Sequence, residues 1–214
     1  MTEPAIVGLA GSYSNPSKTR ILVEEAARRT AHRYGLDHEV IDLAQFGPEL
    51  GSARRLTELA PASLRLVAKI VRAEALIVAS PVYKGSYTGL FKHLIDLFDP
   101  ASLAGKPVLL AATGGGDKHA LVIEHQLRPL FGFFEARTLA TGVYASERDF
   151  ADGALVSETL SGRLDRAIDE FGAYFDPYSE RHSHAVLPAA PLNGATPRVH
   201  VVRSAEAASQ VNGR

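Results

Sequence analysis

Apolar residues gather in five short runs, and each run gives way to a polar turn or to residues with helical spacing. The run Ala75–Ala79 is almost continuously apolar, which is typical of a strand buried on both faces of a sheet. We therefore predict five β-strands, at Ala5–Leu9, His38–Leu43, Ala75–Ala79, Pro107–Ala112 and Thr138–Tyr144.

The segments between the runs carry apolar residues at helical spacing. The helix after the first run pairs Glu24 with Arg28 on its outer face and should end near Gly35, while its inner face is apolar. Residues 44–60 contain Gly and Pro and predict a long irregular connection. Further helices are predicted at Ala62–Arg72, from about Tyr87, at about His119–Phe131 and from about Leu160 to Phe175.

Strands alternating with helices predict an α/β fold in which helices cover both faces of a parallel sheet. We expect a flavodoxin-like three-layer sandwich with strand order 2-1-3-4-5, formed by residues 1–176. Beyond Asp176-Pro177 the composition shifts to Pro, Ala, Ser and Asn, so residues 177–214 are expected to form an extended or flexible tail. Val199–Val202 within it could pair as a short strand on a neighbouring subunit.

The turn after the first strand carries the strongest candidate chemistry. A hydroxyl-rich turn opens a helix there, and the free N–H groups of a first helical turn, together with the helix dipole, favour an anion. Ser12, Ser17 and Thr19 add hydroxyl donors, and Lys18 adds positive charge. The turn predicts a phosphate site; an ordinary strand-to-helix turn with a capping residue is the alternative.

Two nucleotide motifs do not fit this turn. The ATP-binding pattern G-x-x-x-x-G-K-[ST] needs glycines where this chain has Ser12 and Ser17, so Lys18-Thr19 reproduces only its end. The dinucleotide pattern G-x-G-x-x-G is absent. What remains is a Ser/Thr-rich loop of the kind that holds the terminal phosphate of FMN in flavodoxin-like folds.

Two further strands end in unusual turns, at Pro81–Gly85 and Thr113–Gly116. Ligands of doubly wound sheets bind beyond the carboxyl ends of the strands, and the expected order makes the first, third and fourth strands neighbours. Tyr83 offers an aromatic surface, and Gly114–Gly116 let the backbone approach a flat ligand. Taken singly, Tyr83 is explained by packing and the glycines by a flexible loop. Their place at adjoining strand ends predicts one shared cleft.

Composition narrows the class of protein. A chain of 214 residues with 46% hydrophobic content buries one full-sized core, and a net charge of −1 gives no basic surface for nucleic acid. No run suits a membrane span or a signal peptide, so we expect a cytoplasmic protein. The absence of cysteine excludes disulfides, thiolate nucleophiles and cysteine metal sites. His182, His184 and His200 are interpreted as part of a solvated tail, and no metal site is expected.

Three parts of the chain together resemble the NAD(P)H-dependent FMN reductases: Gly11–Thr19, Ala79–Lys84 with Thr88–Lys92, and Ala112–Gly115. The resemblance is greatest to the subgroup that supplies reduced flavin to two-component alkanesulfonate or methanesulfonate monooxygenases, and it covers about residues 5–175. The Pro-Val-Tyr-Lys and Thr-Gly-Gly segments are together fairly specific for the family. The first loop is shared with many flavoproteins.

The resemblance implies hydride transfer from NADPH or NADH to FMN, with the flavin carrying the chemistry and no catalytic side chain required. It places the FMN phosphate at Ser12, Ser17, Lys18 and Thr19, and the isoalloxazine against Pro81, Val82, Tyr83, Lys84, Thr113, Gly114, Gly115 and Gly116. It also implies a homodimer or homotetramer and a flavin-dependent monooxygenase partner. In that subgroup the fourth helix carries a one-residue π-type insertion near the flavin, and His125 falls at that place; a surface or interface histidine is the alternative.

Two other functions stay open. One is an NAD(P)H quinone or azo reductase that retains its FMN, and the other is a flavodoxin-like electron carrier, which a net charge of −1 disfavours because such carriers are usually strongly acidic. The choice between NADPH and NADH is also open, with Lys84, Lys118 and Arg128 as candidates for binding a 2′-phosphate. An apolar stripe over Leu90–Phe98, beside Lys92 and His93, is wide enough for both core and subunit interface.

Overall fold

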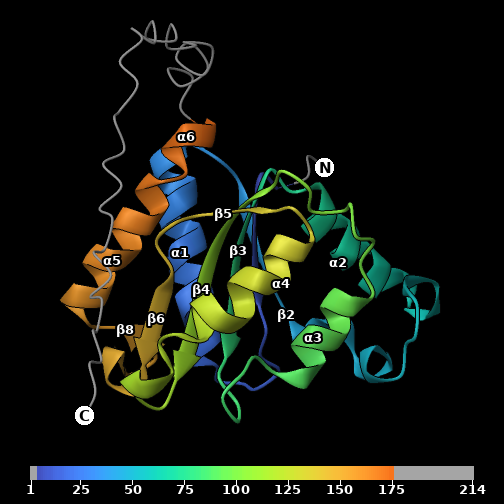
Figure 1. The fold of residues 1–214 in the computed structure, drawn as a ribbon, viewed down its shortest axis with the longest axis horizontal. Helices are drawn as coiled ribbons and strands as arrows, with labels where there is room; N and C mark the ends of the chain where they lie inside the picture. The colour runs from blue at the N-terminus through green and yellow to red at the C-terminus, as the bar shows by residue number, and fades with distance from the viewer. Residues whose placement is uncertain (1–3, 176–214) are drawn as a thin grey trace, which may run out of the picture.

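The computed structural model describes residues 4–175, which build a parallel sheet between two layers of helices (Figure 1). The strand order is β2-β1-β3-β4-β5, and every pair in the sheet is parallel. The strands are β1 (Ile6–Ala10), β2 (His38–Asp42), β3 (Ala75–Pro81), β4 (Pro107–Gly114), β5 (Arg137–Thr138) and β6 (Val143–Ser146). The flavodoxin-like order 2-1-3-4-5 is confirmed.

The fifth predicted strand is two strands, so the prediction of one continuous strand was wrong. β5 pairs with the start of β4 and β6 pairs with its end. Between them, the carboxylate of Glu170 accepts hydrogen bonds from the backbone N–H groups of Ala140 and Thr141. Arg128 donates to the carbonyl of Leu139. Side chains satisfy the backbone there in place of a strand ladder, and the strand is interrupted.

Two separate cores lie on the two faces of the sheet. One face is covered by α1 (Lys18–Tyr34) and α5 (Glu158–Asp169), and the other by α2 (Pro61–Arg72), α3 (Gly89–Asp96) and α4 (Arg128–Phe133). Neighbouring β1 residues divide between the cores, because Ile6 faces α1 while Val7 faces the opposite layer. Burying a side chain such as Phe91 contributes about 1.5–3 kcal/mol to the free energy of folding.

Capping residues and turns set where the helices begin and end. Ser17 caps the start of α1, and Gly35, with φ of 66°, ends it as predicted. α3 begins two residues later than the predicted Tyr87, because Thr88 supplies its N-cap. The predicted helix from Leu160 to Phe175 is two helices, α5 and α6 (Gly172–Phe175), with a turn at Glu170 and Phe171 between them.

Two predicted stretches contain 3₁₀ or π-helical turns in place of the predicted irregular chain or regular helix. The connection at 44–60 contains three 3₁₀ turns, η1 (Leu43–Phe46), η2 (Pro48–Gly51) and η3 (Leu56–Glu58). The helix predicted at 119–131 consists of a 3₁₀ turn η4 (Asp117–His119), a π-helical segment η5 (Ile123–Leu127) and α4. A further 3₁₀ turn, η6 (Glu147–Asp149), and a hairpin, β7 (Phe150–Ala151) with β8 (Ala154–Leu155), follow β6.

Among residues 4–175, no helix has the length and apolar character needed to cross a membrane. The predicted tail at 177–214, with Val199–Val202 and the histidines at 182, 184 and 200, lies outside the described residues.

Candidate active site

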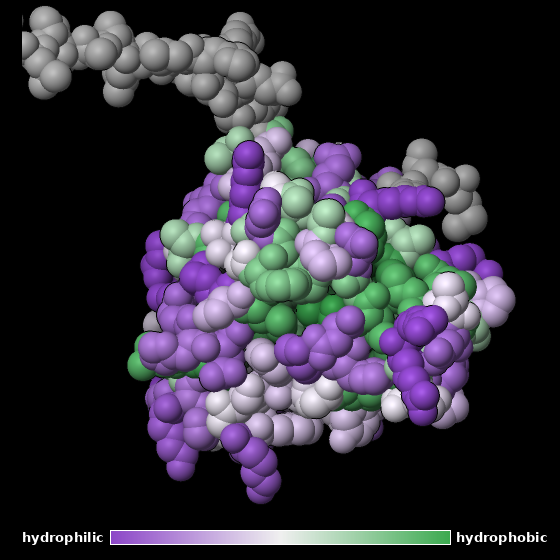
Figure 2. Space-filling model, turned by 45° about the vertical axis from the view of Figure 1, so that its right-hand side comes forward, coloured by the Kyte–Doolittle hydropathy of each residue, from purple (hydrophilic) through white to green (hydrophobic). Residues whose placement is uncertain are grey.

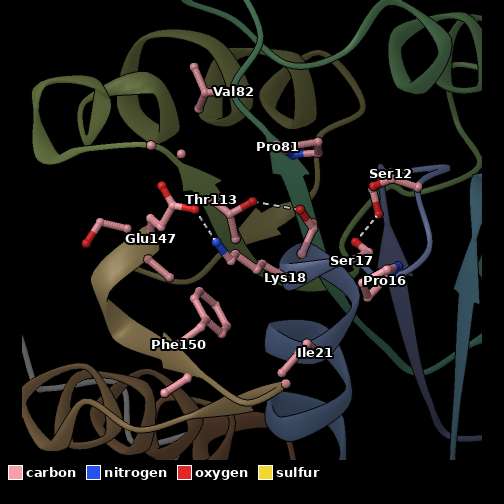
Figure 3. A pocket seen from close by; sticks show the side chains of 18 of the residues that line it. Ser12, Pro16, Ser17, Lys18, Ile21, Pro81, Val82, Thr113, Glu147 and Phe150 are labelled. Carbon is pink, nitrogen blue, oxygen red and sulfur yellow. Dashed lines mark hydrogen bonds and ion pairs between the residues drawn. The ribbon is translucent and has the colours of Figure 1, made fainter.

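The three predicted turns surround one cavity of about 550 Å³ at the carboxyl ends of β1, β3 and β4 (Figure 3). This volume is within the range of small-molecule sites. Most of the predicted binding residues line it: Ser12, Ser17, Lys18, Thr19, Pro81, Val82, Tyr83, Thr113, Gly114 and Gly115. Lys84 and Gly116 belong to the same turns but are not among its lining residues. The turns therefore meet as the strand order predicts.

The start of α1 forms a hydroxyl-rich wall. The hydroxyls of Ser12 and Ser17 lie 2.6 Å apart, and the Ser17 Oγ also accepts the backbone N–H of Arg20 at 3.1 Å. A shared hydrogen bond uses one of the two hydroxyl protons, so the second can be donated to an anion in the cavity. With the N–H groups of the first helical turn, this wall has the donors of an anion site.

Hydrogen bonds join the three turns to one another. The hydroxyls of Thr19 and Thr113 are 2.6 Å apart, which connects the start of α1 to the end of β4. The backbone N–H of Val82 donates to the carbonyl of Thr113 at 2.7 Å. Thr88, which caps α3, donates to the carbonyl of Gly11 at 2.9 Å. The walls are held in register by bonds between elements far apart in sequence.

The cationic side chains of this region are already paired. The Lys18 Nζ is 2.6 Å from the Glu147 Oε1, and this ion pair crosses the cavity in Figure 3. Arg20 is turned away from the cavity toward Asp42 and Glu24. Of these two positive charges, only that of Lys18 lies at the cavity wall.

The glycine turn after β4 is shaped by Tyr144 on β6. The Tyr144 hydroxyl donates to the carbonyl of Gly116 at 2.6 Å, and a Cβ added at Gly114 would lie 2.2 Å from that hydroxyl. At Gly115 a Cβ would meet nothing within 4 Å, so its backbone faces open space. Burial, and after it the charge of Asp117, raise the pKa of Tyr144. Tyr144 thus stays a neutral hydrogen-bond donor under ordinary conditions.

The turn after β3 presents Tyr83 to the cavity. Tyr83 and Ser86 form a backbone bridge, with Lys84 and Gly85 at its tip, both at positive φ (53° and 87°). Tyr83 keeps half of its surface exposed, although it is a large aromatic residue. Tyr83 lines the cavity, whereas Lys84, at the tip of this tight turn, does not.

A wall of the cavity was missing from the sequence prediction. Glu147, Phe150, Ala151, Asp152 and Gly153, from η6 and the β7–β8 hairpin, line the cavity opposite the start of α1. The Asp-Gly pair at the hairpin tip, with φ of 48° and 77°, is a recognised two-residue hairpin signal and could have revealed this element. Nothing local in the sequence reveals that Glu147 meets Lys18.

The π-helical segment implied by the resemblance is present and contains His125. His125 is not among the residues lining the cavity. The segment is joined to the Tyr83 turn through Ser86, whose hydroxyl donates to the Gln126 Oε1 at 3.2 Å. Arg128, a candidate for a 2′-phosphate, is instead occupied by Glu124, Thr138 and the carbonyl of Leu139.

These features suit a flat, phosphorylated ligand. The hydroxyl wall at a helix N-terminus has the donor chemistry for a phosphate, and the open backbone at Gly115 beside Tyr83 leaves room for a ring. Fold and site together define a flavodoxin-like protein with a cavity for a phosphorylated, flat ligand.

Comparison with known proteins gives the particular family. Residues 4–151 match the model of the NADPH-dependent FMN reductases. Over 182 residues the chain is 46% identical to an FMN reductase (NADPH) of Pseudomonas aeruginosa, covering 84% of this chain and 97% of that one. It is 45% identical over 177 residues to the NADH-dependent FMN reductase SfnF of Pseudomonas fluorescens, covering 80% and 94%. An oxidoreductase structure from Corynebacterium diphtheriae has a TM-score of 0.69 at 31% identity, covering 82% and 98%. The chain belongs to the NADPH-dependent FMN reductase family.

Proposed function

We propose that this protein reduces FMN with a hydride from NAD(P)H and delivers the reduced flavin to a partner monooxygenase. The observation that carries the proposal is that anion donors at the start of α1 and the glycine turn after β4 line the same cavity. When bound, FMN itself supplies the hydride-accepting chemistry, and the protein binds and orients it.

The phosphate is proposed to bind where α1 begins. The one hydroxyl proton that the Ser12–Ser17 bond leaves free would be donated to the phosphate. Thr19 would donate its own proton when Thr113 is the donor in the Thr19–Thr113 bond, and the N–H groups of the first turn would add to these donors. Lys18 is at the same wall, but its ammonium must divide its hydrogen bonds between the phosphate and Glu147. Charge-assisted hydrogen bonds of this kind are about twice as strong as neutral ones, which is why a short loop suffices to hold the group.

The ring is proposed to lie between the turns after β3 and β4. Pro81, Val82 and Tyr83 supply one side, and Thr113, Gly114 and Gly115 supply the backbone of the other. Lys84 and Gly116, which the resemblance also implies, would act from just outside the cavity.

The choice between NADPH and NADH is proposed to be made by charged residues at the mouth of the cavity. The two Pseudomonas relatives are named for NADPH in one case and NADH in the other. Arg128 is occupied by Glu124 and backbone carbonyls, so Lys84 and Lys118 remain the candidates for a 2′-phosphate. Their loops adjoin the cavity at the ends of β3 and β4.

The partner and the assembly are also proposals. The resemblance to the reductases of two-component monooxygenase systems supports delivery of reduced flavin to a monooxygenase, and it also supports a homodimer or homotetramer. An FMN-retaining quinone or azo reductase remains the competing enzyme, and an electron carrier the competing class.

Stopped-flow flavin bleaching with NADPH and with NADH, at several FMN concentrations, tests the proposal. In steady-state kinetics, initial rates that depend sequentially on NAD(P)H and FMN support FMN as a substrate. Ping-pong kinetics with tightly retained FMN would favour the quinone or azo reductase. A purified protein that neither binds FMN nor oxidises NAD(P)H in its presence would refute the reductase function.

A further inference from the structure

One ion pair lies across the cavity, and the proposed function leaves it unexplained. Lys18 and Glu147 are 129 residues apart in sequence, and both line the cavity. Figure 3 shows the Lys18 side chain extending from the start of α1 toward Glu147, with the Ser12–Ser17 hydrogen bond on the other side of the helix start. The cation expected to bind a phosphate is therefore held by a carboxylate of this chain.

Glu147 is charged and its bond to Lys18 is exchangeable. The hydrogen bond from Lys18, together with the charge of its ammonium, lowers the pKa of Glu147, so Glu147 is ionised at neutral pH. The side chains of Lys18 and Glu147 are 45% and 70% exposed. Pairs with this exposure are weak, because water competes for both partners. A phosphate entering the cavity can thus displace the carboxylate from Lys18.

We propose that Glu147 sets the affinity for FMN by competing with the FMN phosphate for Lys18. This inference rests on the proposed function, which brings the phosphate to the start of α1. A carboxylate at the wall both occupies the ammonium and repels a phosphate dianion, so it weakens binding without closing the cavity. Differences in affinity between related complexes arise mostly in dissociation rates. Under the proposed function the reduced flavin leaves after each turnover, and a weaker phosphate contact would favour that release.

The fold does not depend on Glu147. The start of η6 is held by Ser146 and Asp149, whose carboxylate accepts both the backbone N–H and the hydroxyl of Ser146 at 2.7 and 2.8 Å. The Glu147 carboxylate projects from this turn toward Lys18. Substituting it removes a charge from the cavity wall and leaves the bonds of the turn in place.

Equilibrium titration of FMN and of riboflavin, followed by flavin fluorescence, tests the inference in E147Q. We expect the Kd for FMN to fall about two- to fivefold, the change that corresponds to the energy of an exposed ion pair. Riboflavin, which has no phosphate, should bind as it does to the unsubstituted protein. The matched control is D169N, which removes a similarly exposed carboxylate paired with Arg33 outside the cavity and should change neither Kd.

A second pair of variants isolates the competition. K18Q should weaken FMN binding. When E147Q is added to K18Q, the affinity for FMN should increase less than it does when E147Q is introduced alone, because the double variant has no Lys18 ammonium to release from Glu147. E147A repeats the test with a different side chain should E147Q fold poorly.

The outcomes separate this inference from the proposed function. Unchanged or weaker FMN binding in E147Q and E147A, with normal binding by the unsubstituted protein, overturns the role of Glu147 alone. Equal tightening of FMN and riboflavin also overturns it, because the effect would then act on the ring. Absence of FMN binding by the unsubstituted protein overturns both.

Discussion

Ser17 combines a structural and a binding position in one side chain. Its hydroxyl accepts the Arg20 N–H as the N-cap of α1 and also contacts the Ser12 hydroxyl at the cavity wall. This residue was predictable, because a hydroxyl at a strand-to-helix turn has local meaning in the sequence. The position of Glu147 was not predictable, because its partner Lys18 lies 129 residues away in sequence and only the fold brings the two together.

The two roles of Ser17 can be separated by S17A. Loss of the cap should lower the free energy of unfolding by about 1 kcal/mol, measured by urea denaturation. Loss of a hydroxyl that donates to a charged phosphate should raise the Kd for FMN about tenfold. S157A is the matched control, because Ser157 caps α5 in the same way but does not line the cavity. It should lose stability alone; an equal loss of FMN affinity in S157A would contradict the assignment.

Gly114 and Tyr144 predict a coupled pair of substitutions. G114A should destabilise the protein by about 1–3 kcal/mol, because the new Cβ would overlap the Tyr144 hydroxyl. Y144F alone should cost about 1 kcal/mol through the lost hydrogen bond to Gly116. Together they should cost less than the sum, since Y144F removes the clashing oxygen. Urea denaturation of the four proteins gives the coupling energy, and strict additivity would refute this contact.

At the scale of elements, the sequence predicts the strands and helices that have a recognisable local pattern of residues. Strands β1, β3 and β4 were identified because each is an apolar run buried on both faces. The interruption of the fifth strand was not predicted. Its backbone N–H and carbonyl groups are hydrogen-bonded by Glu170 and Arg128, which belong to other elements. The π-helical segment has no signature in its apolar spacing; the family resemblance alone pointed to it.

Deletion of His125 tests whether the π-helical segment is a one-residue insertion. Removing one residue should let the segment continue as an ordinary α-helix, so the thermal unfolding midpoint should stay close to its original value. The rate of FMN reduction should fall, because Gln126 would turn away from Ser86 and the Tyr83 turn. Circular dichroism and flavin bleaching measure the two effects.

Deletion of Gly162 from α5 is the control for this experiment. In a regular helix one missing residue rotates everything beyond it by about 100°, which would take Leu164 and Ile168 out of the core. That variant should be strongly destabilised. If the His125 deletion is destabilised to the same degree, the segment is an integral part of the helix and no insertion.

At the scale of the molecule, the surface over α3 and α4 carries an exposed apolar area. Figure 2 shows a hydrophobic area on this side, bordered by charged residues. Phe133 is 66% exposed and borders a groove whose apolar lining includes Ile95, Phe98, Leu130 and Phe134. The stripe at Leu90–Phe98 was expected to serve both core and interface; Phe91, Leu94 and Ile95 are buried, and Ile95 also borders the groove.

F133E is the test of this surface as the contact between copies of the chain in the proposed homodimer or homotetramer. A carboxylate at the centre of an apolar contact loses the burial of the aromatic ring and leaves a charge to be desolvated, so the subunit dissociation constant should rise about tenfold or more. Sedimentation velocity over a concentration series should show smaller species, while circular dichroism stays unchanged. V156E alters a similarly exposed apolar residue beside the β7–β8 hairpin and should leave the assembly intact. If F133E sediments as the unsubstituted protein does, the subunits meet through another surface.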